Sequence, residues 1–385
     1  MAEMDGSLEW MRLHMPLTEQ EIDSLETLSG VRLACSVHLE QKAIRFFESL
    51  LDKGARLFLT TCNPSTVRND VVKRLVSHGA EAHAWNGMTE KDQEEAAGRA
   101  LAWGPTHLYE MGAMLVQRLL TVGPVAAGPA AAIVAGLEAT GSGISCINGL
   151  TRAGRTLGFP VFNCDDVPIK EGLHNRRLVG LSTWNTFMER TRLSLHGRNV
   201  LVVGFGLVGE GVAETARAFG GTVSVAEKDP ARALFAAYAG YPVGSLEELV
   251  PRADVIVTAT GVPGVLNAGL FPSLKQGCFL LNVGHTPNEI DVSGLGARRE
   301  LVPFVEEVSP CGTKVFLFAG GSMANLTAGH GDSLNSFDIT MATLAAGLRF
   351  LFSPEARTHP PGLHALPRAA WEHVARRASG RASGV

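Results

Sequence analysis

The sequence lacks the features that direct a protein to nucleic acids, membranes or secretion. Its 34 basic and 38 acidic residues nearly cancel, so no basic excess favours a nucleic acid or an anionic membrane surface as a partner. The six cysteines form no C-x-x-C pair and no cluster with histidine, which predicts reduced thiols, a cytoplasmic protein and no structural metal. Acidic residues at positions 3 and 5, with no long apolar run nearby, argue against a signal peptide.

Uncharged runs of membrane-spanning length are also scarce, and one segment comes close. Residues 119–137 carry no charged side chain, which is almost enough to cross a bilayer. Pro124 and Pro129 interrupt the run, together with three glycines. We therefore expect a buried strand-turn-helix segment here and not a membrane span.

Length and patterning predict two α/β domains. A chain of 385 residues is too long for one ordinary core, and 45% hydrophobic residues suit a globular protein. Apolar runs alternate with amphipathic stretches in the first third, and again from position 199, which indicates two parallel sheets. The expected strands are 31–37, 56–61, 81–85, 199–203, 222–227, 254–258 and 278–283. The expected helices are 38–51, 70–78, 210–219 and 369–377, with a turn at 62–64.

The strongest local signal is a glycine-rich loop between a strand and a helix. Gly204, Gly206 and Gly209 have the spacing G-x-G-x-x-G directly after an apolar strand. The first glycine permits a tight turn, the second lets a pyrophosphate approach the backbone, and the third lets the helix pack on the strand. The helix N-terminus then offers free N–H groups to the phosphates. The loop predicts a Rossmann domain; an empty Rossmann-like domain is the structural alternative.

An acid at the end of the next strand indicates which dinucleotide binds. Glu227 is the last residue of that expected strand, where a carboxylate accepts hydrogen bonds from the ribose hydroxyls and repels a 2′-phosphate. Lys228 beside it weakens the repulsion slightly. The cofactor predicted from these residues is NAD and not NADP.

Beyond this loop the chain resembles the S-adenosylhomocysteine hydrolase family. The resemblance covers nearly the whole chain and is weakest between about positions 87 and 180. The segments that carry it lie in the family's order, at 35–39, 62–64, 202–211, 227–230, 258–261, 281–285, 289–292, 325–326, 329–330, 335–337 and 366–367. The resemblance implies a Rossmann NAD-binding domain at 181–328 and a discontinuous α/β substrate-binding domain at 1–180 that the chain re-enters at 329–385, with the active site in the cleft between them.

The resemblance also implies a chemistry in which NAD is a recycled catalyst. In this family the ribose 3′-hydroxyl of a nucleoside is oxidised to a ketone, which acidifies the 4′ C–H. Loss of that proton expels the 5′ thioether, water adds back, and the ketone is reduced again. Such a route needs a base for the 3′-hydroxyl and a second acid/base near the 5′ carbon.

Several residues match family positions for these tasks. His38 matches the acid/base near the 5′ position, although a histidine at a strand end can also be satisfied by backbone. Lys170 matches the lysine near the 3′-hydroxyl, a role open to a buried lysine, whereas an exposed loop lysine would have no such role. His285 matches a histidine beside the reacting sugar. The further contacts implied for the nucleoside are Cys62, Asn63, Glu138, Gly329 and His330, and those for NAD are Thr140, Leu207, Val208, Thr258, Thr260, Gly261, Asn282, Gly284, His285 and, at the nicotinamide carboxamide, Asn325.

Departures from the family concern the same regions. Glu110 stands in the family's acidic segment and can replace its catalytic aspartate with one extra methylene. After Lys170, the family's Asp-Asn reads His174-Asn175. The chain also lacks the family's C-terminal tail, which reaches a neighbouring subunit, so we expect a homodimer or homotetramer looser than usual, with the dimer favoured.

The positions that hold adenine in the family have changed as well. They carry Glu40 and Lys42 here, so an acceptor for adenine's amino group has become a cation with three donors. This change predicts a base that offers a carbonyl oxygen to Lys42. The rival interpretation is that Lys42 points to solvent and pairs with Glu40, while backbone near Gly329 and His330 binds adenine.

Three functions remain open from the sequence. The first is an enzyme of this family acting on a nucleoside other than, or besides, S-adenosylhomocysteine. The second is an NAD-dependent dehydrogenase or epimerase of a nucleoside, and the third is a non-catalytic NAD-binding regulator. The base, the 5′ substituent and the net reaction stay undetermined.

Overall fold

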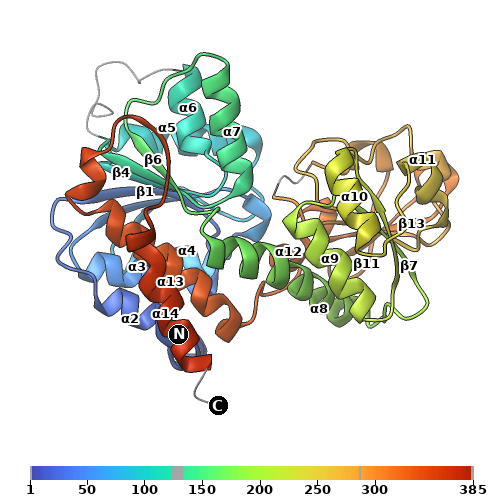
Figure 1. Cartoon of the computed structure of the whole chain (residues 1–385), viewed down its shortest axis with the longest axis horizontal. Helices are drawn as coiled ribbons and strands as arrows, with labels where there is room; N and C mark the ends of the chain where they lie inside the picture. Colours follow the sequence, from blue (N-terminus) through green and yellow to red (C-terminus); the bar gives the residue numbers. More distant parts are fainter. Residues whose placement is uncertain (1, 123–132, 286–287, 383–385) are drawn as a thin grey trace. The chain divides into compact units, whose positions relative to one another are not determined.

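The chain folds into two compact units, each built on its own seven-stranded sheet (Figure 1). A computed structural model describes residues 2–122, 133–285 and 288–382. One unit comprises residues 1–170 and 334–385, and the other comprises residues 171–333. The limits expected from the sequence were 180/181 and 328/329. Among the described residues, no helix combines the length and apolar character needed to cross a membrane.

The sheet of the first unit is parallel throughout, in the order β14-β6-β5-β4-β1-β2-β3. Its strands are β1 (Arg32–Val37), β2 (Arg56–Thr61), β3 (Glu81–Ala82), β4 (His107–Glu110), β5 (Ala135–Glu138), β6 (Pro160–Asn163) and β14 (Gly362–Ala365). Leu33, Cys35 and Val37 face one apolar cluster while Ala34 faces another, so β1 is covered on both sides. This two-sided burial explains the continuous apolar runs in the sequence.

Helices cover this sheet and tie the two ends of the chain together. They are α1 (Ala2–His14), α2 (Pro16–Asp23), α3 (Gln41–Asp52), α4 (Asn69–Ser77), α5 (Glu90–Ala102), α6 (Met114–Val122), α7 (Gly141–Arg152), α13 (Leu334–Leu351) and α14 (Arg368–Ala382). The buried carboxylate of Asp338 in α13 accepts hydrogen bonds from the backbone N–H of Leu17 (2.9 Å) and Thr18 (2.7 Å). It thereby satisfies two free donors at the start of α2.

Three expectations for this unit need correction. The helix expected from position 38 begins at Gln41, because the Glu40 side chain caps it and leaves His38 in the loop after β1. The strand expected at 81–85 ends at Ala82, where the edge strand stops pairing with β2. Within 119–137 the order is α6 and then β5, not strand before helix; residues 123–132 between them lie outside the described residues.

The second unit is a doubly wound sheet in the order β11-β12-β13-β10-β9-β7-β8. Its strands are β7 (Asn199–Val203), β8 (Thr222–Ala226), β9 (Val255–Thr258), β10 (Phe279–Asn282), β11 (Arg299–Val302), β12 (Val305–Val308) and β13 (Val315–Phe318), of which β11 and β12 form an antiparallel edge. Strands β8 and β9 lie on opposite sides of β7. The chain reverses its direction of winding there, which is where such sheets bind ligands.

The helices of this unit are α8 (Val179–Thr191), α9 (Leu207–Ala218), α10 (Pro230–Tyr238), α11 (Leu246–Leu249) and α12 (Ala324–Thr327). A π-helix, Lys170–Leu178, leads into α8. Helix α9 begins three residues before the expected position 210, because Gly206 is already its N-cap. The N–H groups of its first turn therefore belong to the glycine loop.

Candidate active and cofactor sites

A row of polar side chains crosses the first sheet at the carboxyl ends of its strands. Thr60, Ser36, Glu110, Glu138 and Asn163 are successive register partners on β2, β1, β4, β5 and β6. Register partners in a parallel sheet point to the same face, so this row lies on one side. All five residues are buried. The row therefore places two predicted site residues, Glu110 and Glu138, next to each other.

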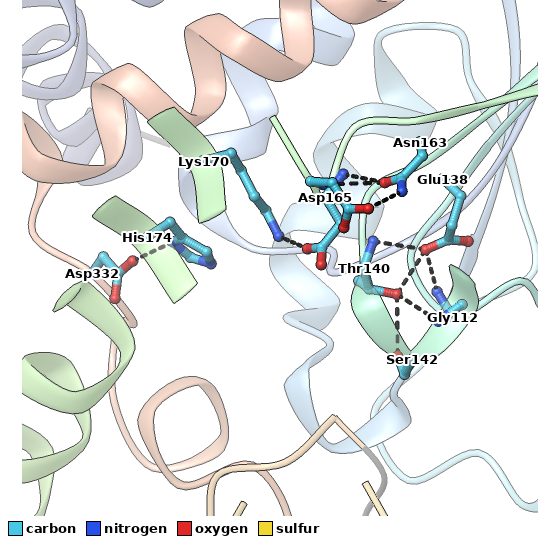
Figure 2. A network of polar contacts seen from close by, with 11 residues as sticks. Gly112, Glu138, Thr140, Ser142, Asn163, Asp165, Lys170, His174 and Asp332 are labelled. Atoms are coloured by element: carbon cyan, nitrogen blue, oxygen red, sulfur yellow. Dashed lines mark hydrogen bonds and ion pairs between the residues drawn. The ribbon is translucent and has the colours of Figure 1, made fainter. Parts of the chain in front are cut away.

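Both carboxylates are already used inside the protein. Glu138 accepts hydrogen bonds from the N–H of Gly112 (2.9 Å) and Ala113 (2.8 Å) and from the N–H and Oγ1 of Thr140 (2.9 and 2.7 Å), as Figure 2 shows in part. Glu110 accepts from the first turn of α6, at Leu115 and Val116. These contacts hold two loops in place. The ribose contact of Glu138, the NAD contact of Thr140 and the catalytic role of Glu110 stay predictions.

The two carboxyl groups hold protons more tightly than free carboxyls do. Burial, reinforced by the neighbouring Glu138, raises the pKa of Glu110 to about 8. Burial also raises the pKa of Glu138 to about 7, although the hydrogen bonds from Thr140, Gly112 and Ala113 oppose the shift. The pair consequently retains a proton near pH 7, and it can act as an acid more readily than as a base.

This pair should make the stability of the protein fall as pH rises from about 5 to about 8. Folding raises both pKa values above the ordinary 4.5, so the stabilisation is complete below that value and disappears as pH passes through the raised values. Each group contributes a slope of up to about 1.4 kcal/mol per pH unit. Urea unfolding of Glu110→Gln across this range should show a flatter slope than the wild type. The exposed control Glu94→Gln should keep the wild-type slope, and an unchanged slope in Glu110→Gln would contradict the pKa assignment.

Around His38, the structure gathers several of the residues predicted to bind the nucleoside. The Nδ1 of His38 lies 2.8 Å from Thr66 Oγ1 and 3.6 Å from Cys62 Sγ. Burial raises the pKa of the Cys62 thiol, which therefore stays protonated. Asn63 accepts hydrogen bonds at Oδ1 from Ser65, whereas its buried Nδ2 has no hydrogen-bond partner among the described residues. A buried amide N–H group without a partner can donate a hydrogen bond to an oxygen of the substrate.

Lys42 and Glu40 form a buried ion pair beside this loop. Lys42 Nζ lies 3.1 Å from Glu40 Oε2, and the lysine side chain is only 4% exposed. The same nitrogen lies 5.2 Å from the ring centre of Phe337 in α13. The rival interpretation had Lys42 pairing with Glu40 and pointing to solvent. The pairing is confirmed, whereas the orientation to solvent is wrong.

Lys170 ends the first unit as a buried cation. It forms an ion pair with Asp165, and Figure 2 shows the two side chains meeting. Asp165 is itself held by Asn163, whose Oδ1 accepts the Asp165 N–H at 2.9 Å. Lys170 is 5% exposed, so the alternative of an exposed loop lysine is wrong. Asp165 was not expected from the sequence as a partner of this lysine.

In the second unit, His174 is paired with an acid that the sequence analysis also missed. Its Nδ1 lies 2.8 Å from Oδ2 of Asp332, which is buried in the loop before α13 (Figure 2). At the position matched from the sequence to the family's aspartate, the structure thus has a histidine in contact with a carboxylate. Asn175 lies in the same π-helix, and Gly329 and His330 lie in the same loop as Asp332. His285 follows β10, next to residues 286–287, which are not described.

The glycine loop has the geometry that a dinucleotide requires. Gly204 has a φ of +93°, and a Cβ on Gly209 would overlap the carbonyl oxygen of Gly204. A Cβ on Gly206 would meet nothing closer than Arg232 Nη1 at 3.6 Å, so the space over this residue is open. Glu227 lies against the loop, where its carboxylate accepts the N–H of Phe205 at 2.6 Å. The loop can therefore hold a pyrophosphate, with Glu227 near the adenosine ribose.

The loops after β9 and β10 are joined by polar contacts. Asn282 Oδ1 accepts from Thr258 Oγ1 (3.2 Å) and from the N–H of Gly284 (2.7 Å). The fully buried Glu289 accepts from the N–H and Oγ1 of Thr260 (2.8 and 2.7 Å) and from the N–H of Gly261 (2.8 Å). From the sequence, Glu289 was expected only as part of the segment 289–292 that resembles the family, without a role of its own.

Asn325 provides a test of whether the nicotinamide fits. Its Nδ2 donates to Ser182 Oγ at 3.1 Å, and that hydroxyl donates its own proton to the Val179 carbonyl at 3.2 Å. Ser182 must therefore accept from Asn325, which fixes the orientation of the amide. The buried Asn325 Oδ1 has no hydrogen-bond partner among the described residues. An acceptor in this state matches the amino group of the nicotinamide carboxamide, so the residues present fit NAD.

Comparisons with known proteins agree with this arrangement. Residues 181–331 match the model of the S-adenosyl-L-homocysteine hydrolase NAD-binding domain. Over 379 residues the chain is 31% identical to S-inosyl-L-homocysteine hydrolase of Methanopyrus kandleri, covering 96% of this chain and 88% of the relative. It is 32% identical to adenosylhomocysteinase of Pyrobaculum aerophilum over 89% of this chain and 84% of the relative. It is 31% identical to S-inosyl-L-homocysteine hydrolase of Methanococcus maripaludis, again over 89% of this chain and 84% of the relative.

These matches extend well beyond the cofactor domain, since the first covers 96% of this chain. Among the described residues, no group of three or more histidine, cysteine, aspartate or glutamate side chains could hold a metal ion. The chain is a member of the S-adenosylhomocysteine hydrolase family and an NAD-dependent hydrolase.

Proposed function

We propose that this enzyme hydrolyses an S-nucleosyl-homocysteine with a 6-oxopurine base, as in S-inosyl-L-homocysteine, in preference to S-adenosylhomocysteine. The observation that carries the proposal is the buried ion pair of Lys42 with Glu40. Two of the relatives above bear the name S-inosyl-L-homocysteine hydrolase, which supports the same base.

The argument is one of matching donors with acceptors. Hypoxanthine presents a carbonyl oxygen at position 6 and an N–H at position 1. Lys42 can donate to the first and Glu40 can accept from the second. Adenine in the same orientation would set its amino group against the ammonium of Lys42 and its bare N1 against the carboxylate of Glu40. This buried mismatch costs about 1–3 kcal/mol in total.

The remaining residues supply the acid–base steps. NAD, when bound, supplies the reversible oxidation of the ribose 3′-hydroxyl that makes the 4′ C–H acidic. Lys170 passes its own proton to Asp165 and takes the proton of that hydroxyl. His38 takes the proton released from the 4′ carbon and gives it to the 5′ sulfur as the thioether leaves, and it then takes a proton from the water that adds back and returns it to the 4′ carbon. His174, held by Asp332, is the second group near the ribose, and His285 lies beside the same sugar.

A change of base preference tests the proposal. The wild type should use S-inosyl-L-homocysteine about 10- to 100-fold more efficiently than S-adenosylhomocysteine, because mismatched buried polar groups discriminate on that scale. Lys42→Glu should restore an acceptor for the adenine amino group and reverse the preference. The measurement is kcat/KM from the release of homocysteine thiol with each substrate.

The exposed lysine of α4 gives the matched control, because Lys73→Glu makes the same change of charge and should keep the wild-type preference. Equal and fast turnover of S-adenosylhomocysteine by the wild type and Lys42→Glu would refute the base assignment.

Spectra of the protein with nucleoside test the wider reaction. Transient NADH supports it, stoichiometric NADH release would mean a dehydrogenase, and no reduction would mean a regulator. We also infer a homo-oligomer, a dimer in preference to a tetramer, from the family resemblance.

A further inference from the structure

The contacts of Thr66 determine which nitrogen of His38 carries the proton. Thr66 ends the short helical turn Pro64–Thr66 and is 3% exposed. Its Oγ1 makes two contacts of equal length. One is with the carbonyl oxygen of Asn63 at 2.8 Å, and the other is with His38 Nδ1 at 2.8 Å.

A hydroxyl has one proton for these two contacts, so the two possible arrangements can be compared directly. If Thr66 donated to His38, two oxygens would face each other at 2.8 Å with no proton between them, which is repulsive. If Thr66 donates to Asn63, the carbonyl is satisfied and Nδ1–H of His38 donates to the hydroxyl. Only the second arrangement places a proton in both contacts.

Two further contacts, those of Thr61 and Cys62, do not change this result. Thr61 Oγ1 also donates to the Asn63 carbonyl, but at 3.0 Å it lies farther away than Thr66 does. Cys62 Sγ lies 3.6 Å from His38 Nδ1. A sulfur at that distance is a weak partner and can share the Nδ1 proton as a secondary acceptor. The short oxygen contact therefore decides the tautomer.

We propose that Thr66 is a positioning residue that holds neutral His38 in its Nδ1–H form, with the lone pair on Nε2. Because free histidine side chains prefer the opposite tautomer, the enzyme needs such a contact to make Nε2 the basic nitrogen. In a catalytic histidine the correct tautomer is worth a large factor in rate. The catalytic consequence rests on the function proposed above, whereas the tautomer itself does not.

Nitrogen-15 spectra of the intact protein test the tautomer without reference to activity. With labelled histidine, the His38 signals are those lost in His38→Gln. In the wild type near neutral pH, Nδ1 should show the shift of a protonated nitrogen and Nε2 that of an unprotonated one. Thr66→Val, which keeps the shape but removes the hydroxyl, should move His38 toward the Nε2–H form. Thr66→Ser should retain the wild-type pattern.

Kinetics supply the second readout. Thr66→Val should lower kcat about 10- to 100-fold with little change in KM, within the total contribution of one acid–base group. Thr66→Ser should restore most of kcat. Thr61→Val removes a hydroxyl from the same carbonyl but not from His38, so any loss there measures a purely structural effect.

An Nε2–H signal for His38 in the wild type, or an unchanged tautomer in Thr66→Val, would overturn the inference. Failure of the proposed function looks different. In that case the nitrogen signals would follow the expected pattern while no nucleoside thioether was hydrolysed.

Discussion

Replacing Gly206 by alanine should remove most of the affinity for NAD and leave the protein folded. The backbone at this position has a φ of −75°, which alanine adopts without strain. The added methyl group would meet only Arg232 Nη1, at an ordinary van der Waals distance of 3.6 Å. The same methyl group would occupy the open space where the pyrophosphate approaches the N-terminus of α9.

The expected loss is large because the phosphates would move away from the amides that bind them. Two charge-assisted hydrogen bonds at about 1.5–3 kcal/mol each correspond to a loss on the order of 100- to 10,000-fold in NAD affinity. Calorimetric titration measures the affinity, and thermal unfolding in the absence of NAD measures the fold.

Two other glycines frame this experiment. In Gly149→Ala, in α7, the added methyl group meets no atom within 4 Å. This variant should lower neither the NAD affinity nor the unfolding temperature. Gly209→Ala would overlap the Gly204 carbonyl oxygen and should lower the unfolding temperature as well as the affinity. NAD bound by Gly206→Ala as tightly as by the wild type would show that the pyrophosphate does not pass over Gly206.

The sheets could be predicted from the sequence because their physical causes are local. The limits predicted for β2 and β7 agree with the structure at 56–61 and 199–203, since strands buried on both faces appear as short apolar runs between turns. The glycine loop was predictable for a similar reason, because only glycine permits its turn and its close contacts. Helix starts were less predictable. The caps at Glu40 and Gly206 moved the starts of α3 and α9 by three residues in opposite directions.

The partners of the site residues could not be predicted in the same way. Asp165, Thr66 and Asp332 contact Lys170, His38 and His174 because loops bring them together, and no periodicity in the sequence records such a contact. Glu289 reaches back 29 residues to the Thr260 turn. The resemblance identified the residues that match family positions, but not those that hold them in place. Supporting residues of this kind become visible only when hydrogen bonds are traced through the fold.

Lys170→Met should abolish the first step of the reaction and leave NAD bound. Methionine keeps most of the length and apolar volume of the side chain, so the buried position stays filled. The variant loses the group proposed to take the proton of the 3′-hydroxyl, a contribution on the order of 100- to 10,000-fold in rate. Mixing the NAD-loaded variant with nucleoside under single-turnover conditions should give almost no NADH absorbance, whereas the wild type should give a rapid rise.

The surface supplies a matched pair for this experiment. Lys275 forms an ion pair with Asp254 at 2.6 Å, but its side chain is 42% exposed. Lys275→Met therefore makes the same chemical change to a lysine–aspartate pair away from the proposed chemistry, and it should reduce NAD at the wild-type rate. Asp165→Asn tests the ion pair itself, because this variant keeps Lys170 but removes the carboxylate that contacts it. We expect a loss smaller than that of Lys170→Met, since the base is still present but less firmly held. If Lys170→Met reduced NAD as fast as Lys275→Met, the proton of the 3′-hydroxyl would have to go to another group, and the proposed role of Lys170 would be wrong.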